Sequence, residues 1–298
     1  MMTPSTKLKR KQLNRFIQQV LVHETAVKGV VGIGSIATGR MRPDSDIDAV
    51  IFLDPYDPYI VPAEAIWDAK SDTFHSIFIE DERLHTEGIQ LDFARLDWQT
   101  WAEPDCNWPE GRRAELASGW LAYDPSGEVE ALIDEQAAYP ESLRLARLDE
   151  AITWLDQHLG ENGPKKRWES LDSIIAHDRL HAAYHYLVQG LFAYNRQWRV
   201  WRNREMSALL ELPWLPVQFE QRILTAANAP GLDYLGYMSR VEKLQAMFHE
   251  LLLQLIEDGT YGESPIGEAF VRLHDEPGRA WNMDEWNARR ISQMASLK

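Results

Sequence analysis

Two kinds of hydrophobic pattern divide the chain. In the first part, short apolar or alternating runs predict strands over residues 28–33, 46–53, 74–79 and 89–96, with 120–123 as a candidate for one more. Ahead of them, apolar residues at steps of three and four from Leu13 to Leu21 predict a helix ending near Thr25. The first part therefore combines strands and helices.

From about residue 141 onward the apolar spacing is helical almost throughout. It predicts helices over residues 141–159, 166–194, 215–228, 235–257 and 283–297. A Gly- and Pro-containing segment, 160–164, separates the first two. The expected fold class is α+β, with a mixed-sheet domain over residues 1–135 and an all-α helical bundle over residues 136–298.

The charge balance narrows the choice of partners. Against 31 Lys and Arg the chain carries 46 Asp and Glu, a net charge of −15. An acidic protein repels a phosphate backbone at long range, so we expect a small, cationic partner and no nucleic acid.

Cysteine content and hydropathy bear on the compartment. Cys106 is the single cysteine, which rules out a disulfide framework within one chain and fits a reducing cytoplasm. The basic start leads into Leu13 without a continuous apolar stretch, and no run approaches the roughly 20 apolar residues of a membrane span. We expect a cytoplasmic protein without membrane attachment; the oligomeric state stays open.

Three carboxylates stand out because they interrupt apolar strands. Asp46 and Asp48 share one predicted strand and point to the same face, about 7 Å apart along it. Asp92 lies between Leu91 and Phe93 on another strand. If the strands are neighbours, the three acids converge on a pair of Mg²⁺ ions, which prefer hard oxygen ligands. A lone Asp-x-Asp pair is also typical of a solvated strand edge.

A glycine-containing turn precedes these acids. Gly34 and Ser35 leave the strand before it, and Gly39 follows four residues later. Glycine lets the backbone approach a phosphate, and the Ser35 hydroxyl adds a donor, so we expect Gly34, Ser35 and Gly39 to contact a nucleotide.

The string GSIATGRMRPDSDID places ten residues between Gly34-Ser35 and Asp46-x-Asp48. It resembles the GS…DxD signature of the nucleotidyltransferase superfamily, with Asp92 where a third carboxylate is expected. The resemblance implies that Asp46, Asp48 and Asp92 bind Mg²⁺, with Asp92 as a possible general base, and that ATP is the donor. It is specific over residues 28–96.

With its helical second half, the chain is similar to the aminoglycoside adenylyltransferase-like branch, in which the acceptor sits between two domains. The resemblance implies transfer of AMP from ATP to a hydroxyl of a small, cationic, aminoglycoside-like molecule. Two alternatives stay open: a protein-modifying or antitoxin-type nucleotidyltransferase, and a regulator that binds nucleotide without turnover.

Four further groups of residues are candidates near such a site. Within the basic segment 195–204 of the helical half, Arg202 and Arg204 are expected to reach the triphosphate, although surface ion pairs would explain them too. Glu87 is a candidate for binding the acceptor. Arg40 and Arg95 each lie near the proposed site residues in the sequence, and whether they contact phosphate stays open. One helix face carries Asp178, His181 and His185. Three interpretations of this face stay open: a zinc site, a packing interface between the helix and the other domain, or a solvent-exposed face.

Overall fold

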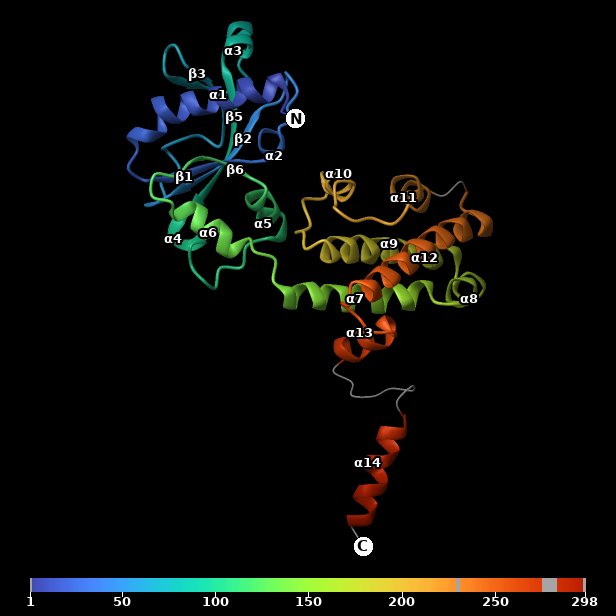
Figure 1. Ribbon diagram of the computed structural model, residues 1–298. Coiled ribbons are helices and arrows are strands. Elements are labelled where there is room, and N and C mark those ends of the chain that lie inside the picture. The colour runs from blue at the N-terminus through green and yellow to red at the C-terminus, as the bar shows by residue number, and fades with distance from the viewer. Residues whose placement is uncertain (1, 229–230, 275–282, 297–298) are drawn as a thin grey trace. The chain divides into compact units, whose positions relative to one another are not determined.

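The computed structural model describes residues 2–228, 231–274 and 283–296. The chain divides into two compact units, Met1–Ala138 and Tyr139–Lys298 (Figure 1). The division expected after residue 135 falls inside a helix, α6, Glu128–Gln136.

The first unit is built on a mixed sheet, as the α+β class requires. The six strands of its described residues lie in the order β4-β3-β5-β2-β1-β6. Only β2 and β5 pair in parallel; the other pairs are antiparallel. The bounds are β1 Val27–Gly32, β2 Ile47–Leu53, β3 Glu64–Asp68, β4 Thr73–His75, β5 Ile89–Asp97 and β6 Trp120–Tyr123.

The helices of this unit cover both faces of the sheet (Figure 1). They are α1 Pro4–Gln19, the 3₁₀ turn Leu21–His23, α2 Gly34–Thr38, α3 Glu82–Glu87, α4 Trp98–Trp101, α5 Glu110–Ala117 and α6. Phe16 of α1 shares a core with Ala49 and Phe93. Val50 shares the second core with Val129 of α6. Since neighbouring strand residues alternate in direction, even-numbered positions of β2 face away from α1.

Three elements of the first unit differ from the prediction. α1 begins at Pro4, because Thr3 caps it by accepting a hydrogen bond from the backbone N–H of Thr6, and it ends at Gln19 rather than near Thr25. The predicted strand 74–79 is a three-residue strand, β4, followed by a turn. The pattern did not predict β3, which lies between β4 and β5 in the sheet.

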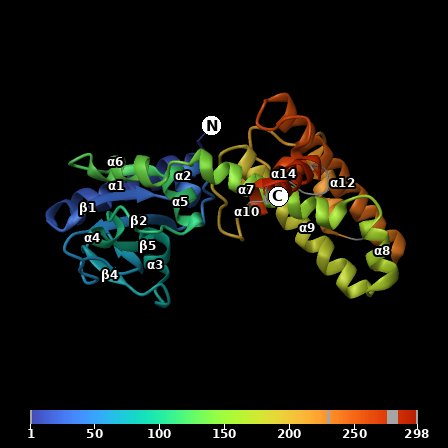
Figure 2. The same ribbon diagram turned by 90° about the horizontal axis from the view of Figure 1, so that it is seen from below.

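The second unit is helical in its described residues. Its elements are α7 Glu141–Leu159, α8 Gly163–Ser170, α9 Ser173–Tyr194, α10 Glu205–Leu209, α11 Phe219–Ala227, α12 Tyr234–Glu257, α13 Pro265–His274 and α14 Met283–Ser296. Leu155, Leu187 and Leu251, from α7, α9 and α12, are buried in one common core. Figure 2 shows α7 and α9 side by side.

The helix predicted over residues 166–194 is two helices in the structure. Asp172, with φ of 149°, breaks the path, and its carboxylate accepts a hydrogen bond from the N–H of Ile174 at the start of α9. Residue 297, at the end of the last predicted helix, lies outside the described residues. In the described ranges, no helix has the length and apolar content needed to cross a membrane.

Candidate metal and nucleotide site

The parallel pairing of β2 with β5 brings the three singled-out carboxylates together. Asp48 lies directly beside Asp92 in the register, and Asp46 is two residues before Asp48. One carboxylate oxygen from each of the three acids lies within 4.8 Å of the others. We expected the three acids to converge if their two strands were neighbours. The strands are neighbours, and the three carboxylates do converge.

The electrostatics of this carboxylate cluster are unfavourable without a cation. Burial, and then the charge of Asp46, raises the pKa of Asp92 above its usual range. Asp92 has no hydrogen-bond or ion-pair partner among the described side chains. Lys9 of α1 acts on Asp46: burial lowers the pKa of Lys9, and the attraction of Asp46 opposes that shift.

The donor set fits a hard divalent cation. Three carboxylates supply only oxygen ligands, and their mutual repulsion is the penalty that a bound cation would remove. Asp46, Asp48 and Asp92 are the residues that would hold Mg²⁺. In the described part of the chain, no other group of three His, Cys, Asp or Glu side chains comes this close together.

The Gly34-Ser35 turn lies directly against β2. The backbone N–H of Ile33 donates to the carbonyl of Asp48 at 3.0 Å, which ties the turn to the strand that carries the acids. Gly34 has a φ of 62° and Gly39, which ends α2, has a φ of 80°. Both values lie in the left-handed region that favours glycine. Contact of Gly34, Ser35 and Gly39 with a nucleotide stays a prediction.

The first helix holds this turn in place, a role that the sequence analysis missed. Arg10 donates from Nε and Nη2 to the carbonyl of Ile36 at 3.1 and 2.9 Å, and from Nη2 to that of Ala37 at 3.0 Å. Thr6 Oγ1 accepts from the N–H of Met41 at 3.0 Å. The available signal was Thr3-Pro4, a cap followed by a proline that favours a helix start.

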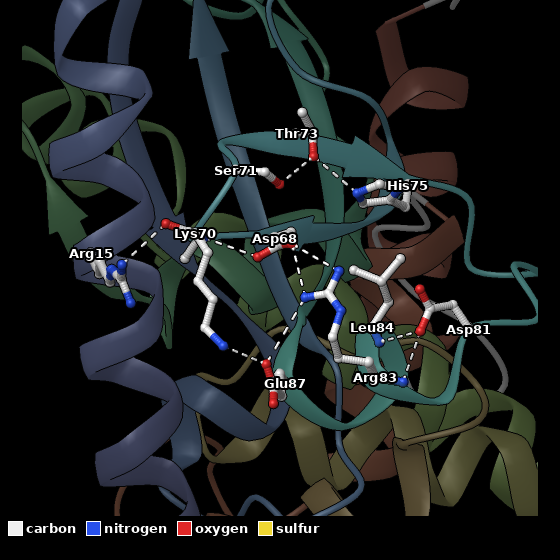
Figure 3. Close-up of polar contacts among 11 residues, drawn as sticks. Arg15, Asp68, Lys70, Ser71, Thr73, His75, Asp81, Arg83, Leu84 and Glu87 are labelled. Carbon is white, nitrogen blue, oxygen red and sulfur yellow. Dashed lines mark hydrogen bonds and ion pairs between the residues drawn. The ribbon is translucent and has the colours of Figure 1, made fainter.

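Glu87 lies at the end of α3 in an ion-pair network (Figure 3). Its carboxylate is 2.6 Å from Lys70 Nζ and 4.0 Å from Arg83 Nη1. Arg83 also pairs with Asp68, whose pKa is lowered to about 2, first by the N–H of Lys70 and then, against burial, by the Arg83 hydrogen bond. Two cations thus share the charge of Glu87, and its role in binding the acceptor stays a prediction.

The candidate arginines of the helical unit also have protein partners. Arg199 and Arg202 both pair with the carboxylate of Glu205, which is 5% exposed. Arg204 precedes α10, and its backbone N–H donates to Trp201. The phosphate role of Arg202 and Arg204 stays a prediction. Arg95 donates from Nη1 to the carbonyls of Pro58 and Val61 at 2.8 and 3.1 Å.

His181 and His185, the two candidate histidines of the helical unit, contact each other. His185 Nε2 lies 3.0 Å from His181 Nε2, and His185 Nδ1 lies 3.3 Å from Arg199 Nη2. Because a guanidinium only donates, Nδ1 of His185 accepts, and its Nε2 carries the proton toward His181. This arrangement disfavours a metal at that nitrogen. Asp178 does not complete a three-ligand group with them.

A comparison with known proteins identifies the first unit. Residues 10–94 match the family model of the nucleotidyltransferase domain, and this range contains Gly34, Ser35 and all three acids. A solved structure of a nucleotidyltransferase-like protein from Exiguobacterium sibiricum 255-15 is 11% identical, with 92% of this chain and 83% of that chain covered and a TM-score of 0.42. No curated protein matches the chain. On the family match, residues 10–94 of the chain form a nucleotidyltransferase domain.

Proposed function

We propose that the protein is a Mg²⁺-dependent enzyme that transfers AMP from ATP to a hydroxyl group of a small, cationic, aminoglycoside-like acceptor. The observation that carries this proposal is the convergence of Asp46, Asp48 and Asp92 within 4.8 Å inside a nucleotidyltransferase domain. A cytoplasmic location remains a prediction from the single cysteine.

The proposed reaction is a substitution at the α-phosphorus. The acceptor oxygen forms a bond to the α-phosphorus, the bond from that phosphorus to the oxygen bridging to the β-phosphate breaks, and pyrophosphate leaves. Bound Mg²⁺ would neutralise phosphate charge and orient the attacking and leaving oxygens. In this scheme Asp46 and Asp48 bind metal, and Asp92 is a metal ligand or takes the acceptor's proton.

The acidity of the chain supports a cationic acceptor. A net charge of −15 attracts a polyamine-like molecule at long range and repels a nucleic acid.

The test is pyrophosphate release. We would supply ATP, with GTP, CTP and UTP in parallel, with Mg²⁺ or EDTA, against a panel of cationic hydroxyl compounds that includes aminoglycosides. Asp48→Asn is the test variant, and Asp134→Asn, an exposed site on α6 with the same chemical change, is its matched control. We expect release that requires Mg²⁺ and an acceptor, is lost in Asp48→Asn and persists in Asp134→Asn.

Two other outcomes would redirect the proposal. Nucleotide binding without release across the whole panel would favour the protein-modifying or regulatory alternative. Equal turnover by Asp48→Asn and by the parent protein would remove the metal mechanism.

A further inference from the structure

Lys9 occupies an unusual position for a lysine, on the side of α1 that packs against the protein. It follows Thr6 by three residues and precedes Leu13 by four, so the three side chains share one stripe of the helix. Thr6 and Leu13 are fully buried, and Lys9 is partly buried. Its apolar stem therefore lies against the protein, and its ammonium emerges at the edge of the contact.

The neighbours of Lys9 on α1 fix its place beside the segment that leads to the acids. Thr6 Oγ1 accepts a hydrogen bond from the N–H of Met41, and Arg10 donates to two carbonyls of α2. Figure 1 shows the start of α1 beside α2. Asp46 follows five residues after Met41, directly before β2. This part of α1 is thus held close to the start of β2.

Of the three acids, Asp46 is the one that a side chain from α1 can reach. Phe93, next to Asp92, is buried in the core that α1 covers, so Asp92 faces the other side of the sheet. Asp48 faces that side too. Asp46 precedes the first residue of β2 and lies at the end of the sheet. Its attraction accordingly opposes the lowering of the pKa of Lys9 by burial.

Lys9 is near Asp46 without forming a pair with it. Its ammonium has no hydrogen-bond or ion-pair partner in the described part of the chain. A paired lysine of the same unit looks different: Lys70 Nζ lies 2.6 Å from the carboxylate of Glu87 (Figure 3). Lys9 is therefore a partly buried cation whose donors are free for a ligand.

Metal binding would leave Lys9 in need of an anion. Once Asp46 holds Mg²⁺, the negative charge that attracts Lys9 is shared with a second cation, and the two cations repel each other. An anion that contacts both removes this repulsion and the cost of burying the ammonium. The triphosphate of the donor is the reactant with that charge.

The geometry of the substitution indicates which phosphates Lys9 would contact. In an in-line reaction the attacking and leaving oxygens lie on opposite sides of the α-phosphorus. Asp92, the candidate that takes the acceptor's proton, marks the attacking side. Lys9 lies at the Asp46 end of the cluster and approaches from the α1 side of the sheet, so it is on the leaving side.

We propose that Lys9 binds the β- and γ-phosphates of the donor, the part that leaves as pyrophosphate. The inference rests on the proposed function and adds to it an anion-binding residue from α1. The contact is a charged hydrogen bond from the ammonium to a phosphate oxygen.

The test compares Lys9→Met with Lys11→Met in the full-length protein. Methionine keeps the apolar stem and removes the ammonium. Lys11 is exposed on the same helix, so the control makes the same change away from the cluster. Calorimetry would measure the affinity for Mg²⁺ alone and then, with Mg²⁺ present, for inorganic pyrophosphate, for AMP and for an ATP analogue with a methylene bridge between the α- and β-phosphorus.

Two further variants separate charge from packing. Lys9→Arg keeps the positive charge, and Lys9→Gln is a second neutral variant in case Lys9→Met does not fold. Circular dichroism would check the fold of each.

We expect Lys9→Met to weaken binding of pyrophosphate and of the ATP analogue about tenfold, the size of one lost charged hydrogen bond. Affinity for AMP should be unchanged, because AMP has no β- or γ-phosphate. Affinity for Mg²⁺ alone should not fall, since the variant removes a positive charge near a metal ligand. Lys11→Met should bind every probe as the parent protein does, and Lys9→Arg should keep most of the affinity for pyrophosphate.

Three results would overturn the proposal about Lys9. They are unchanged affinity of a folded neutral variant for pyrophosphate and the ATP analogue, a loss of AMP affinity as large as that for the analogue, and a loss in Lys9→Arg as large as in Lys9→Met. In each case the proposed function survives, because the parent protein still binds the nucleotide with Mg²⁺. If the parent protein binds neither the analogue nor pyrophosphate, the proposed function itself fails.

Discussion

Acidic side chains are used in opposite ways in the two units. Asp149 of α7 is 4% exposed and fully engaged: Arg272 of α13 donates two hydrogen bonds to it, each of 2.9 Å, and Tyr261 donates one of 2.6 Å. Asp92 of β5, by contrast, faces Asp48 and Glu64 without a basic partner among the described residues. The first acid joins two helices; the second lies among acids.

The contrast suggests a criterion: a structural carboxylate has basic or hydrogen-bonding partners in the protein, whereas a functional carboxylate lies among other acids. A buried acid that is paired and hydrogen-bonded stabilises the fold as long as its partners remain. An acid placed among other acids lowers stability, and a bound cation can compensate it. Glu205, held by Arg199 and Arg202, belongs to the first class. Each prediction below tests whether this division holds.

The largest effect is expected at the carboxylate cluster. Asp46→Asn should lower turnover at least about a thousandfold, a barrier increase of about 4 kcal/mol, because a neutral amide is a poor ligand for Mg²⁺. Thermal unfolding without metal should change little. Single-turnover pyrophosphate release and a melting curve check both statements. A variant that lost activity only by unfolding would place Asp46 with the structural acids.

The second effect is expected at the paired acid of the helical unit. Asp149→Asn should lower the free energy of unfolding by about 3 kcal/mol, because Arg272 then loses its closest counter-ion and keeps only Glu268, at 3.6 Å. Nucleotide binding at a temperature where the variant is folded should be unchanged. Denaturant unfolding followed by tryptophan fluorescence measures the loss, with Asp134→Asn as control. A loss below about 0.5 kcal/mol would contradict the structural role.

The sequence predicted this division only in part. Strand alternation was enough to place Asp46 and Asp48 on one face, and apolar periodicity gave α7 with both of its ends, Glu141 and Leu159. Such patterns act within one element, where side-chain direction follows directly from residue spacing. They say nothing about which element lies beside which.

What the sequence missed depends on contacts between distant segments. β3 was not predicted, so the register that sets Glu64 opposite Asp92 could not be inferred. Glu87 pairs with Lys70, 17 residues before it, and no spacing rule selects such a partner in a chain with 46 acids. The pair of Arg202 with Glu205 has the i,i+3 spacing, which the sequence does contain. The break at Asp172 arises from a single backbone angle inside an otherwise continuous helical pattern.

A third and smaller effect concerns acid stability of the helical unit. Burial, and then Arg167 and Arg179, lowers the pKa of His158 to about 4. Between pH 6.5 and 4 the unfolded chain therefore binds a proton that the folded chain does not, so this contribution to stability is complete above pH 6.5 and falls as the pH falls.

We expect that loss to reach about 3 kcal/mol by pH 4. His158→Gln should flatten the pH dependence of the melting temperature over this range, whereas His249→Gln, at an exposed site of α12, should leave it unchanged. A parent protein whose melting temperature does not fall between pH 6.5 and 4 would show that His158 is protonated in the fold without penalty.

The smallest effect gives the sharpest comparison, because it has the opposite sign to that at Asp149. Asp92→Asn removes one charge from a row of like charges, so without metal it should raise the free energy of unfolding, by less than about 1 kcal/mol. Added Mg²⁺ should raise the melting temperature of the parent protein, since a ligand that binds only the folded state stabilises it, and should have little effect on the variant. Melting curves of both proteins with EDTA and with Mg²⁺ measure the four values. If Asp92→Asn is destabilised without metal, as Asp149→Asn is expected to be, then Asp92 supports the fold, and the absence of a basic partner does not identify a functional acid in this protein.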